Sequence, residues 1–531
     1  MRRRRARPGA LALITVLWGA LLVGWLQLTP LYRAADEPTH ADLVLRLRDG
    51  GSYAAPGTLD VDPRVRASFP LANLSTAERP ELPDHFPLPF SSTDVPPRDV
   101  PYGQLPAAQG LAPYANQMTQ HPPLYYLLLA GESRLLPGFG GWSFPVQLGA
   151  LRLLSALLLL PLPALAAAAA RRLGAGPAVA TAAALLPLAV PQLAHVGASV
   201  NNDVLLCLLG AAVAVPLLAV SRGDVSRRTA VAVGVLLGLA LLTKAWAVGL
   251  LAWAGLAYLL ALLGPARAER GRAVVSGLLA AALAMAVGGW WWVANVLRFG
   301  ALQPQGLAPF PARDTEPDAV AFVLGVLRRL TASTWGNFGW LEVQLAEPVR
   351  VSAAVVVTAA LGLTVARPLD APWARPAAAV ALAAGCVQLA VVGQQSLKNY
   401  LRGGYFAGLQ GRYLYAFVGV VAALTAVGLA RVVPRRVLPL VALVAVVVLQ
   451  AVGVLTALDG FWQPDGEGLR RALAVQAAWA PFPRTVSLVA ALVAAACTVL
   501  LAVRLVPPAP APPVRRRPAL DAALLGSATR A

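Results

Sequence analysis

Residues 10–28 read ALALITVLWGALLVGWLQL, and a few residues later residues 33–40 read RAADEPTH. An uncharged run of the first kind is long enough to cross a bilayer as a helix. The second stretch places two adjacent carboxylates, Asp36 and Glu37, and also His40, where that helix would meet water. Carboxylates are costly inside a bilayer, so the pair either marks the end of the first helix or belongs to an active site.

The rest of the chain has the composition of a polytopic membrane protein. Of its 531 residues, 58% are hydrophobic and 13% are charged, and about a dozen apolar runs approach the length of a bilayer crossing. The formal net charge is +19, but the arginines recur between apolar runs, which is typical of a topology signal and not of a nucleic-acid-binding surface. Cys207, Cys386 and Cys497 lie in apolar runs without CxxC spacing, so neither disulfides nor a zinc site are expected.

The apolar runs predict an all-α polytopic fold with about 12 or 13 transmembrane helices and a cytoplasmic N-terminus. Thirteen arginines and only three carboxylates fall in the five short loops that this topology places inside, as the positive-inside rule requires. Two stretches leave the count open. Residues 122–136 are marginal in length for a crossing, and residues 228–267 are too long for one span. There we expect two short helices that meet at Lys244, with one bent helix as the alternative.

This topology divides the chain into three parts. Residues 1–430 form a membrane core, and its two large extracytoplasmic loops, 31–121 and 298–350, are expected to pack into a small cap. Residues 431–507 add C-terminal transmembrane helices, and residues 508–531 form a cytoplasmic tail rich in Pro and Arg. We therefore expect a multi-pass protein of the plasma membrane.

Polar residues that no anchoring role explains gather on the predicted outer side. They include Asp36, Glu37, His40, His121, Asn202, Asp203, Lys244, Trp340, Lys398 and Arg412. A pump or channel would place ionisable groups along the spans, whereas these spans are almost free of them. The pattern indicates a cavity at the outer membrane surface, suited to a substrate whose tail stays in lipid while its head group sits in water.

Five short motifs resemble those of one known superfamily. They are the Asp36-Glu37 pair after the first helix, HPPLYY at residues 121–126, Asn202-Asp203, LTK at residues 242–244 and QGRY at residues 410–413. In this order and on this side of the membrane they are similar to the GT-C superfamily of integral-membrane glycosyltransferases. That superfamily uses polyprenyl-phosphate-linked sugars and includes the protein mannosyltransferases and the lipid A aminoarabinose transferases. The resemblance spans roughly residues 10–429, and DEPxH and QGRY most resemble a bacterial branch.

The resemblance implies transfer of a sugar from a polyprenyl-phosphate donor to an extracytoplasmic glycan, lipid or protein, with inversion at the anomeric carbon. Asp36 matches the acid of the first loop and is the expected base. Glu37 either orients the acceptor or caps the adjoining short helix. Arg412 is the first candidate to hold the donor phosphate, followed by Lys244 and Lys398.

The remaining candidates each have a structural alternative. Asn202 and Asp203 bind substrate or a metal, or cap their own helix. His40 and His121 bind substrate or hold the loop, and Trp340 stacks on sugar or belongs to an aromatic belt. Some members of the superfamily use a divalent cation and others do not, and these residues show no metal-specific spacing. Metal use therefore stays open.

Two other classes of function stay open beside the transferase. A transporter or flippase for lipid-linked glycans would need polar residues through its spans, and their scarcity argues against it. A non-catalytic scaffold for envelope assembly would tolerate replacement of Asp36 and Arg412.

Overall fold

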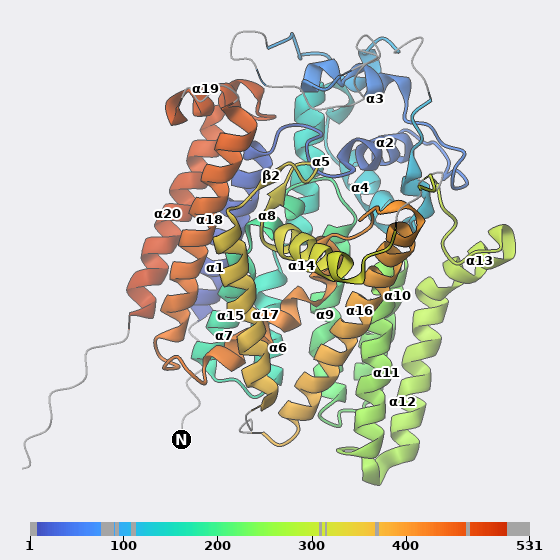
Figure 1. Cartoon of the computed structure of the whole chain (residues 1–531), viewed down its shortest axis with the longest axis vertical. Helices are drawn as coiled ribbons and strands as arrows, with labels where there is room; N and C mark the ends of the chain where they lie inside the picture. The colour runs from blue at the N-terminus through green and yellow to red at the C-terminus, as the bar shows by residue number, and fades with distance from the viewer. Residues whose placement is uncertain are drawn as a thin grey trace, which may run out of the picture.

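The computed structural model describes residues 8–75, 90, 95–107, 113–306, 311–313, 316–366, 371–463 and 468–506. The N-terminal arginines, the predicted tail at 508–531 and part of the first predicted loop lie outside the described residues. The predicted all-α architecture is confirmed. Long helices stand side by side as a bundle, and shorter elements cover one end of it, which we call the capped end (Figure 1).

The bundle is built from long or paired helices that run between the capped end and the opposite end. They are α1 (Pro8–Leu28), α5 (Phe144–Leu158), α6 (Leu162–Arg172), α7 (Pro177–Leu185), α8 (Pro191–Gly197), α9 (Asp203–Val220), α10 (Arg227–Leu241), α11 (Val248–Leu263), α12 (Arg270–Ala284), α13 (Trp290–Phe299), α15 (Glu347–Ala366), α16 (Ala374–Gly403), α17 (Val418–Leu429), α18 (Leu438–Trp462) and α20 (Arg484–Leu505). A 3₁₀ segment, Gly411–Phe417, leads into α17.

The apolar helices make this a polytopic membrane protein. Ten helical segments of the described residues are long and apolar enough to cross a membrane, and the pair α7 and α8, bent by 69°, adds an eleventh. The 15-residue α10 is shorter, but it connects the far end of α9 with Lys244, whose side chain bonds to Asp203 at the start of α9. Because α10 must return the chain across the bundle, the described residues contain up to twelve crossings, the lower predicted value.

The two open stretches also have a defined structure. A 3₁₀ turn, Ala245–Ala247, separates α10 from α11, so the prediction of two helices meeting at Lys244 is confirmed and the single bent helix is wrong. Residues 122–136 form α4 (Leu124–Arg134), whose 11 residues span about 16 Å at 1.5 Å per residue. Since the hydrocarbon core is about 30 Å thick, α4 does not cross it.

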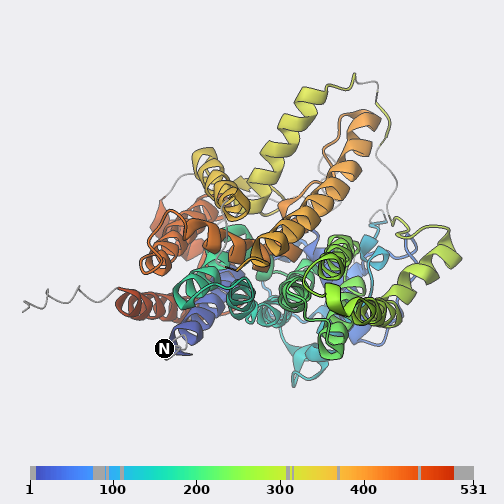
Figure 2. The same cartoon turned by 90° about the horizontal axis from the view of Figure 1, so that it is seen from below.

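The cap contains the elements that position the candidate site. They are α2 (Glu37–Arg48), α3 (Pro63–Ala67), α4, α14 (Ala319–Trp335), the two-residue strands β1 (Asn337–Phe338) and β2 (Val343–Gln344), and α19 (Leu469–Trp479). The antiparallel strands pair Asn337 with Gln344 and Phe338 with Val343. Seen from below, α14 and α16 extend together away from the rest of the bundle (Figure 2). The Tyr400 hydroxyl on α16 donates to the Asp318 carbonyl just before α14, 3.2 Å away.

Some polar side chains inside the bundle pair with one another and with backbone from distant helices. On α1, Trp25 donates through Nε1 to Gln450 Oε1 on α18 at 2.8 Å. Gln450 in turn donates to the Leu188 carbonyl at 2.7 Å, in the bend between α7 and α8. These bonds satisfy groups that would otherwise be costly in a membrane interior. They also hold α1 in register with the helices beside it.

Candidate functional site

The turn between α1 and α2 holds Asp36 in an unusual backbone conformation. Asp36 is the residue just before α2, with φ 62° and ψ 8°, and it is one of few residues other than glycine with positive φ in the described chain. L-residues rarely adopt this left-handed region, and strained backbone of this kind clusters at functional sites. The Asp36 side chain remains 38% exposed, so the strained turn presents its carboxylate to the surroundings.

Arg412 reaches that carboxylate from a distant part of the chain. Its Nη2 donates to Asp36 Oδ2 at 2.7 Å, and its Nη1 donates to the Ala35 carbonyl at 3.3 Å. The Arg412 side chain is buried and lies in the 3₁₀ segment before α17. Removal of water around the Asp36 carboxyl raises its pKa, but the charges of Arg412 and Lys244 outweigh this effect and hold the pKa below its ordinary value.

A second ion pair lies directly beside the first. Lys244 Nζ donates to Asp203 Oδ1 at 2.7 Å, and both side chains are buried. Arg412 Nε lies 3.4 Å from Asp203 Oδ2, which links the two pairs. The Tyr413 ring lies within cation–π range of both cations, 5.2 Å from Lys244 Nζ and 5.5 Å from the Arg412 guanidinium carbon. We call Asp36, Asp203, Lys244 and Arg412 the charge cluster.

Several buried polar atoms around the charge cluster lack a hydrogen-bond partner among the described residues. They are Asp203 Oδ2, Arg412 Nε, Asn202 Oδ1 and His121 Nδ1. Buried polar groups in proteins are nearly always hydrogen-bonded. Asp203 Oδ2 and Arg412 Nε face each other at 3.4 Å, so Asn202 Oδ1 and His121 Nδ1 are the two open positions, which a polar ligand or ordered water would complete.

The two predicted histidines lie next to the cluster in a neutral form. His40 on α2 stacks on Tyr126 and makes a 3.0 Å hydrogen bond through Nδ1 to its hydroxyl, and Asn202 Nδ2 donates to the same hydroxyl at 3.4 Å. Burial, with the charges of Lys244 and Arg412, holds the pKa of His40 well below its ordinary value. Burial, Lys244 and His40 act in the same direction on the pKa of His121. Neither ring is expected to add positive charge at neutral pH.

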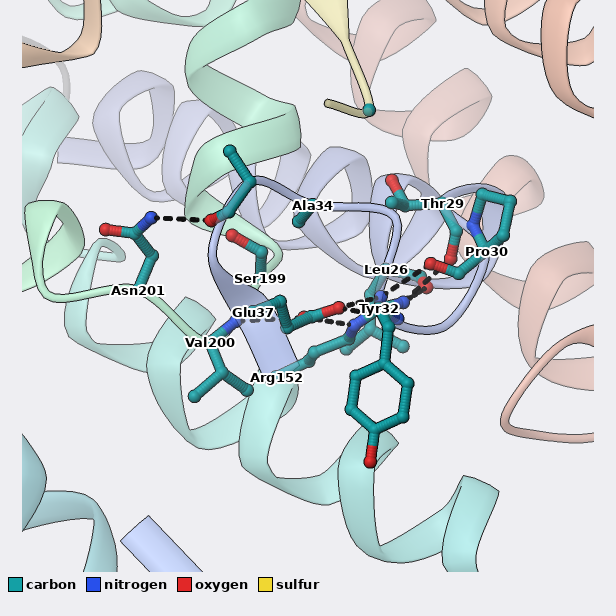
Figure 3. Close-up of polar contacts among 12 residues, drawn as sticks. Leu26, Thr29, Pro30, Tyr32, Ala34, Glu37, Arg152, Ser199, Val200 and Asn201 are labelled. Atoms are coloured by element: carbon teal, nitrogen blue, oxygen red, sulfur yellow. Dashed lines mark hydrogen bonds and ion pairs between the residues drawn. The ribbon is translucent and has the colours of Figure 1, made fainter. Parts of the chain in front are cut away.

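Glu37 makes a different set of contacts from its neighbour Asp36 (Figure 3). Its Oε1 accepts from Arg152 Nε at 2.7 Å and from the Val200 amide at 3.1 Å. Its Oε2 accepts from Arg152 Nη2 at 2.5 Å and from the Tyr32 amide at 3.0 Å. Four donors fill the acceptor sites of the two oxygens, and both side chains are completely buried. These contacts suit a residue that fixes the turn better than one that contacts substrate.

Arg152 is the central partner that the sequence analysis missed. Besides Glu37 it donates to the carbonyls of Leu26, Thr29 and Pro30, at 3.1, 2.7 and 2.8 Å. The signal was present in the sequence, because Arg152 stands alone inside the apolar run of α5. A charged residue within a span is expected to have a partner, and the nearest unexplained carboxylates were those of the first loop.

Of the predicted site residues outside the charge cluster, Trp340 lies against the turn that carries Asp36, whereas Lys398 is not joined to the cluster in the described chain. Trp340, in the β1–β2 turn, donates through Nε1 to the Ala34 carbonyl at 3.0 Å, so it covers the turn that carries Asp36. Lys398 lies exposed on α16. In the described chain no recorded ion pair or hydrogen bond joins Lys398 to the charge cluster. The structure thus brings Lys244 and Arg412 together, but not Lys398.

The carboxylates of the cluster do not form a ready-made cation site. Among the described residues no group of three or more His, Cys, Asp or Glu side chains could hold a metal ion. Asp36 and Asp203 already have Arg412 and Lys244 beside them, so a divalent cation would have to displace a positive side chain. The cations, in contrast, have donors to spare, because an ammonium has three N–H groups and a guanidinium five. The geometry fits an anion better than a metal.

Comparison with solved structures finds ArnT from Cupriavidus metallidurans. In the apo state it is similar to this chain with a TM-score of 0.48 and 16% identity, over 94% of this chain and 78% of that one. ArnT bound to undecaprenyl phosphate gives a TM-score of 0.43 at the same identity and the same coverage of both chains. No curated protein matches the sequence.

The comparison with family models covers more than half of the sequence. The model described as "Predicted membrane protein (DUF2142)" matches residues 20–421. This range includes Asp36, Asp203, Lys244 and Arg412, and it ends within α17. The chain therefore belongs to the DUF2142 family of predicted membrane proteins.

Proposed function

We propose that this protein is a membrane glycosyltransferase that moves a sugar from a polyprenyl-phosphate donor to an acceptor outside the cytoplasm. The observation that carries the proposal is the contact between Asp36, a partly exposed carboxylate on a strained turn, and Arg412, a buried guanidinium. Sugar transfer from a lipid phosphate needs a base for the acceptor hydroxyl and a positive group for the leaving phosphate, and these two residues supply both. The motif resemblance to the GT-C superfamily supports the same reaction.

Asp36 acts as the general base in this proposal. The acceptor hydroxyl gives its proton to the carboxylate while its oxygen attacks the anomeric carbon, and the bond from that carbon to the phosphate oxygen breaks. The leaving polyprenyl phosphate takes the bonding electrons, and the configuration at the anomeric carbon inverts. Asp36 Oδ2 accepts from Arg412, and no recorded hydrogen bond of the described residues reaches Oδ1. Oδ1 is therefore the atom that faces the acceptor.

Arg412 and Lys244 hold the leaving phosphate. Arg412 Nη1 and Nη2 each make one hydrogen bond within the described chain and so each keep a second N–H, and Lys244 bonds there to Asp203. Donors aimed at developing negative charge stabilise a leaving phosphate strongly when water is excluded. Asp203 keeps the two cations together and is a positioning residue. Asn202 and the two histidines line the sugar side of the site.

The site lies at the capped end of the bundle, where a lipid-linked donor is accessible. Polyprenyl chains remain in the bilayer, so a donor phosphate sits at the membrane surface beside the start of α9 and α11. In the described residues the arginine-rich short loops join helices at the end away from the cap (Figure 1), which the positive-inside rule assigns to the cytoplasm. On this basis the site is extracytoplasmic and the N-terminus is cytoplasmic.

The test is release of polyprenyl phosphate by the purified protein in nanodiscs. A panel of polyprenyl-phosphate sugars is supplied with crude envelope glycans, glycolipids and proteins as acceptors. Asp36→Asn is expected to lower release by about 10²–10⁴-fold, the usual contribution of a general base, while donor binding persists. Release at an equal rate by this variant contradicts the role of Asp36.

Asp62→Asn is the matched control. Asp62 lies in the same cap and accepts from the Arg64 amide at the start of α3, a capping role that Asn fills equally well. It should release product at the wild-type rate. Movement of the intact donor across the bilayer without release would instead favour a flippase. Wild-type assembly of the envelope with Asp36→Asn in cells would favour a scaffold.

A further inference from the structure

A large basic cavity lies next to the charge cluster and is not used by the proposed transfer. Its volume is about 740 Å³, and it opens between α14, the first turn of α15, the β1–β2 hairpin and residues 406–410. We call it the basic pocket. Arg328, Arg329 and Arg350 line it, and no Asp or Glu is found among its described lining residues. Its charge is therefore that of an anion site.

The most buried of the three arginines has one donor atom without a partner among the described residues. Arg350 is only 6% exposed, and its Nε has no hydrogen-bond partner among the described residues. Asn337, also 6% exposed and also part of the lining, has an unpartnered Oδ1. A buried cation without a counter-charge is costly. An anionic group in the pocket would relieve that cost.

The surroundings of the pocket indicate a ligand with a lipid tail. On α14, Val320, Val323, Leu324 and Leu327 are 68, 54, 60 and 57% exposed. Their spacing puts these four side chains on one helix face, and such a face on a helix at the end of a membrane bundle suits an interfacial position. Leu324 also lines the pocket, beside Arg328. The apolar face and the arginines meet at the pocket mouth, where a lipid head group would lie.

The basic pocket and the charge cluster share one segment of chain. Gln410 lines the pocket, and two residues later Arg412 bonds to Asp36. Between them, the Gly411 amide donates to Ser333 Oγ at 2.8 Å, which fixes the segment against α14. The basic pocket and the charge cluster are therefore joined through residues 410–412.

We propose that the basic pocket binds the phosphate head group of a membrane lipid that serves as the acceptor. This inference rests on the proposed function and adds the substrate class, a phosphate-bearing lipid with a free hydroxyl. Guanidinium groups suit phosphate because they donate in a fixed, paired geometry. The donor phosphate lies at Arg412 and the acceptor phosphate at Arg350, so the two lipids occupy different sides of residues 410–412.

The test separates the two sites by binding, without turnover. Native mass spectrometry of the full chain in detergent counts bound phosphatidic acid and bound polyprenyl phosphate in parallel samples. Arg350→Gln should lower phosphatidic acid binding about tenfold, the effect of one charged hydrogen bond, and leave polyprenyl phosphate unchanged. Arg412→Gln should lower polyprenyl phosphate binding and leave phosphatidic acid binding unchanged. Because Arg350 is buried, Arg328→Gln at the exposed rim is a second variant with the same expected direction.

Arg272→Gln on α12 is the matched control, since Arg272 is exposed and pairs only with Glu269 in the described chain. It should bind both lipids as wild type does. Loss of polyprenyl phosphate but not phosphatidic acid in Arg350→Gln would make the pocket a donor site and overturn the proposal. Displacement of phosphatidic acid by an equal concentration of inorganic phosphate would overturn the inference that the ligand of the basic pocket is a lipid. If the two lipids bind as expected but the protein releases no polyprenyl phosphate from the donor, only the proposed function is refuted.

Discussion

Arg152 on α5 and Glu37 at the start of α2 form a doubly hydrogen-bonded ion pair with both side chains completely buried. Glu37 also accepts from two backbone amides, and Arg152 also donates to three carbonyls, one in the last turn of α1 and two just after it. The pair therefore ties the end of the first helix to the loop before α9. Asp36, one residue before Glu37, takes its orientation from this network.

Removal of Arg152 should destabilise the whole protein. Arg152→Met keeps the length of the side chain but leaves Glu37 charged and buried, which typically costs about 3–5 kcal/mol. We expect a clear drop in the thermal unfolding midpoint, measured by size exclusion after heating. Arg272→Met removes an exposed arginine from an i,i+3 pair and should change stability by less than about 1 kcal/mol. Equal midpoints for the two variants would show that the buried pair is not structural.

The rate of sugar release should be insensitive to pH across the neutral range. The pKa of Asp36 is lowered below its ordinary value. Its carboxylate is therefore fully ionised at every pH well above about 4. Its ionised form is lost only as the pH falls through this lowered pKa. His40 and His121 have pKa values well below the ordinary value and add no inflection near pH 6.5. A profile of kcat/KM from pH 5 to 8 should be flat, and a rise through pH 6.5 would contradict this assignment.

Replacement of Arg412 should change both donor binding and the acid limb of the profile. Arg412→Lys keeps a positive charge but loses the paired guanidinium donors, so KM for the donor should rise about tenfold with a smaller change in the acid limb. Arg412→Gln removes the charge that lowers the pKa of Asp36, so the acid limb should move to higher pH. Steady-state kinetics at several pH values distinguishes the two effects. An unmoved acid limb in Arg412→Gln would show that the two side chains are not coupled.

Close packing of α9 on the Arg412 segment should be needed for activity. A Cβ added to Gly210 would overlap the carbonyl oxygen of Ala416, so Gly210→Ala must push α9 away from residues 411–417 and lengthen the contact of Arg412 with Asp203. We expect sugar release to fall at least tenfold, because small displacements of catalytic groups are costly. Gly255→Ala is the control, since a Cβ there meets nothing within 4 Å. If both variants retain the wild-type rate, this packing does not set the site geometry.

Much of the architecture could be predicted from local sequence. Long apolar runs specify membrane helices because backbone polar groups must be satisfied within the segment. The single Thr243-Lys244 break in a run too long for one span correctly predicted two helices, α10 and α11. Short motifs at the predicted outer ends of helices also selected all four members of the charge cluster by residue type.

Only the tertiary structure decided what each polar residue contacts. Asp36 and Glu37 are adjacent in sequence, yet Asp36 bonds to Arg412, whereas Glu37 is completely buried and bonds to Arg152. Lys244 and Lys398 were the second and third candidates to hold the phosphate, and within the described chain Lys244 bonds to the cluster while Lys398 does not. The basic pocket likewise joins α14, α15 and residues 406–410. Hydrophobicity and helix periodicity act over a few residues of one chain segment, so the sequence determined the helices by itself. Ion pairs between segments depend on how those helices pack, and therefore the site exists only in the folded bundle.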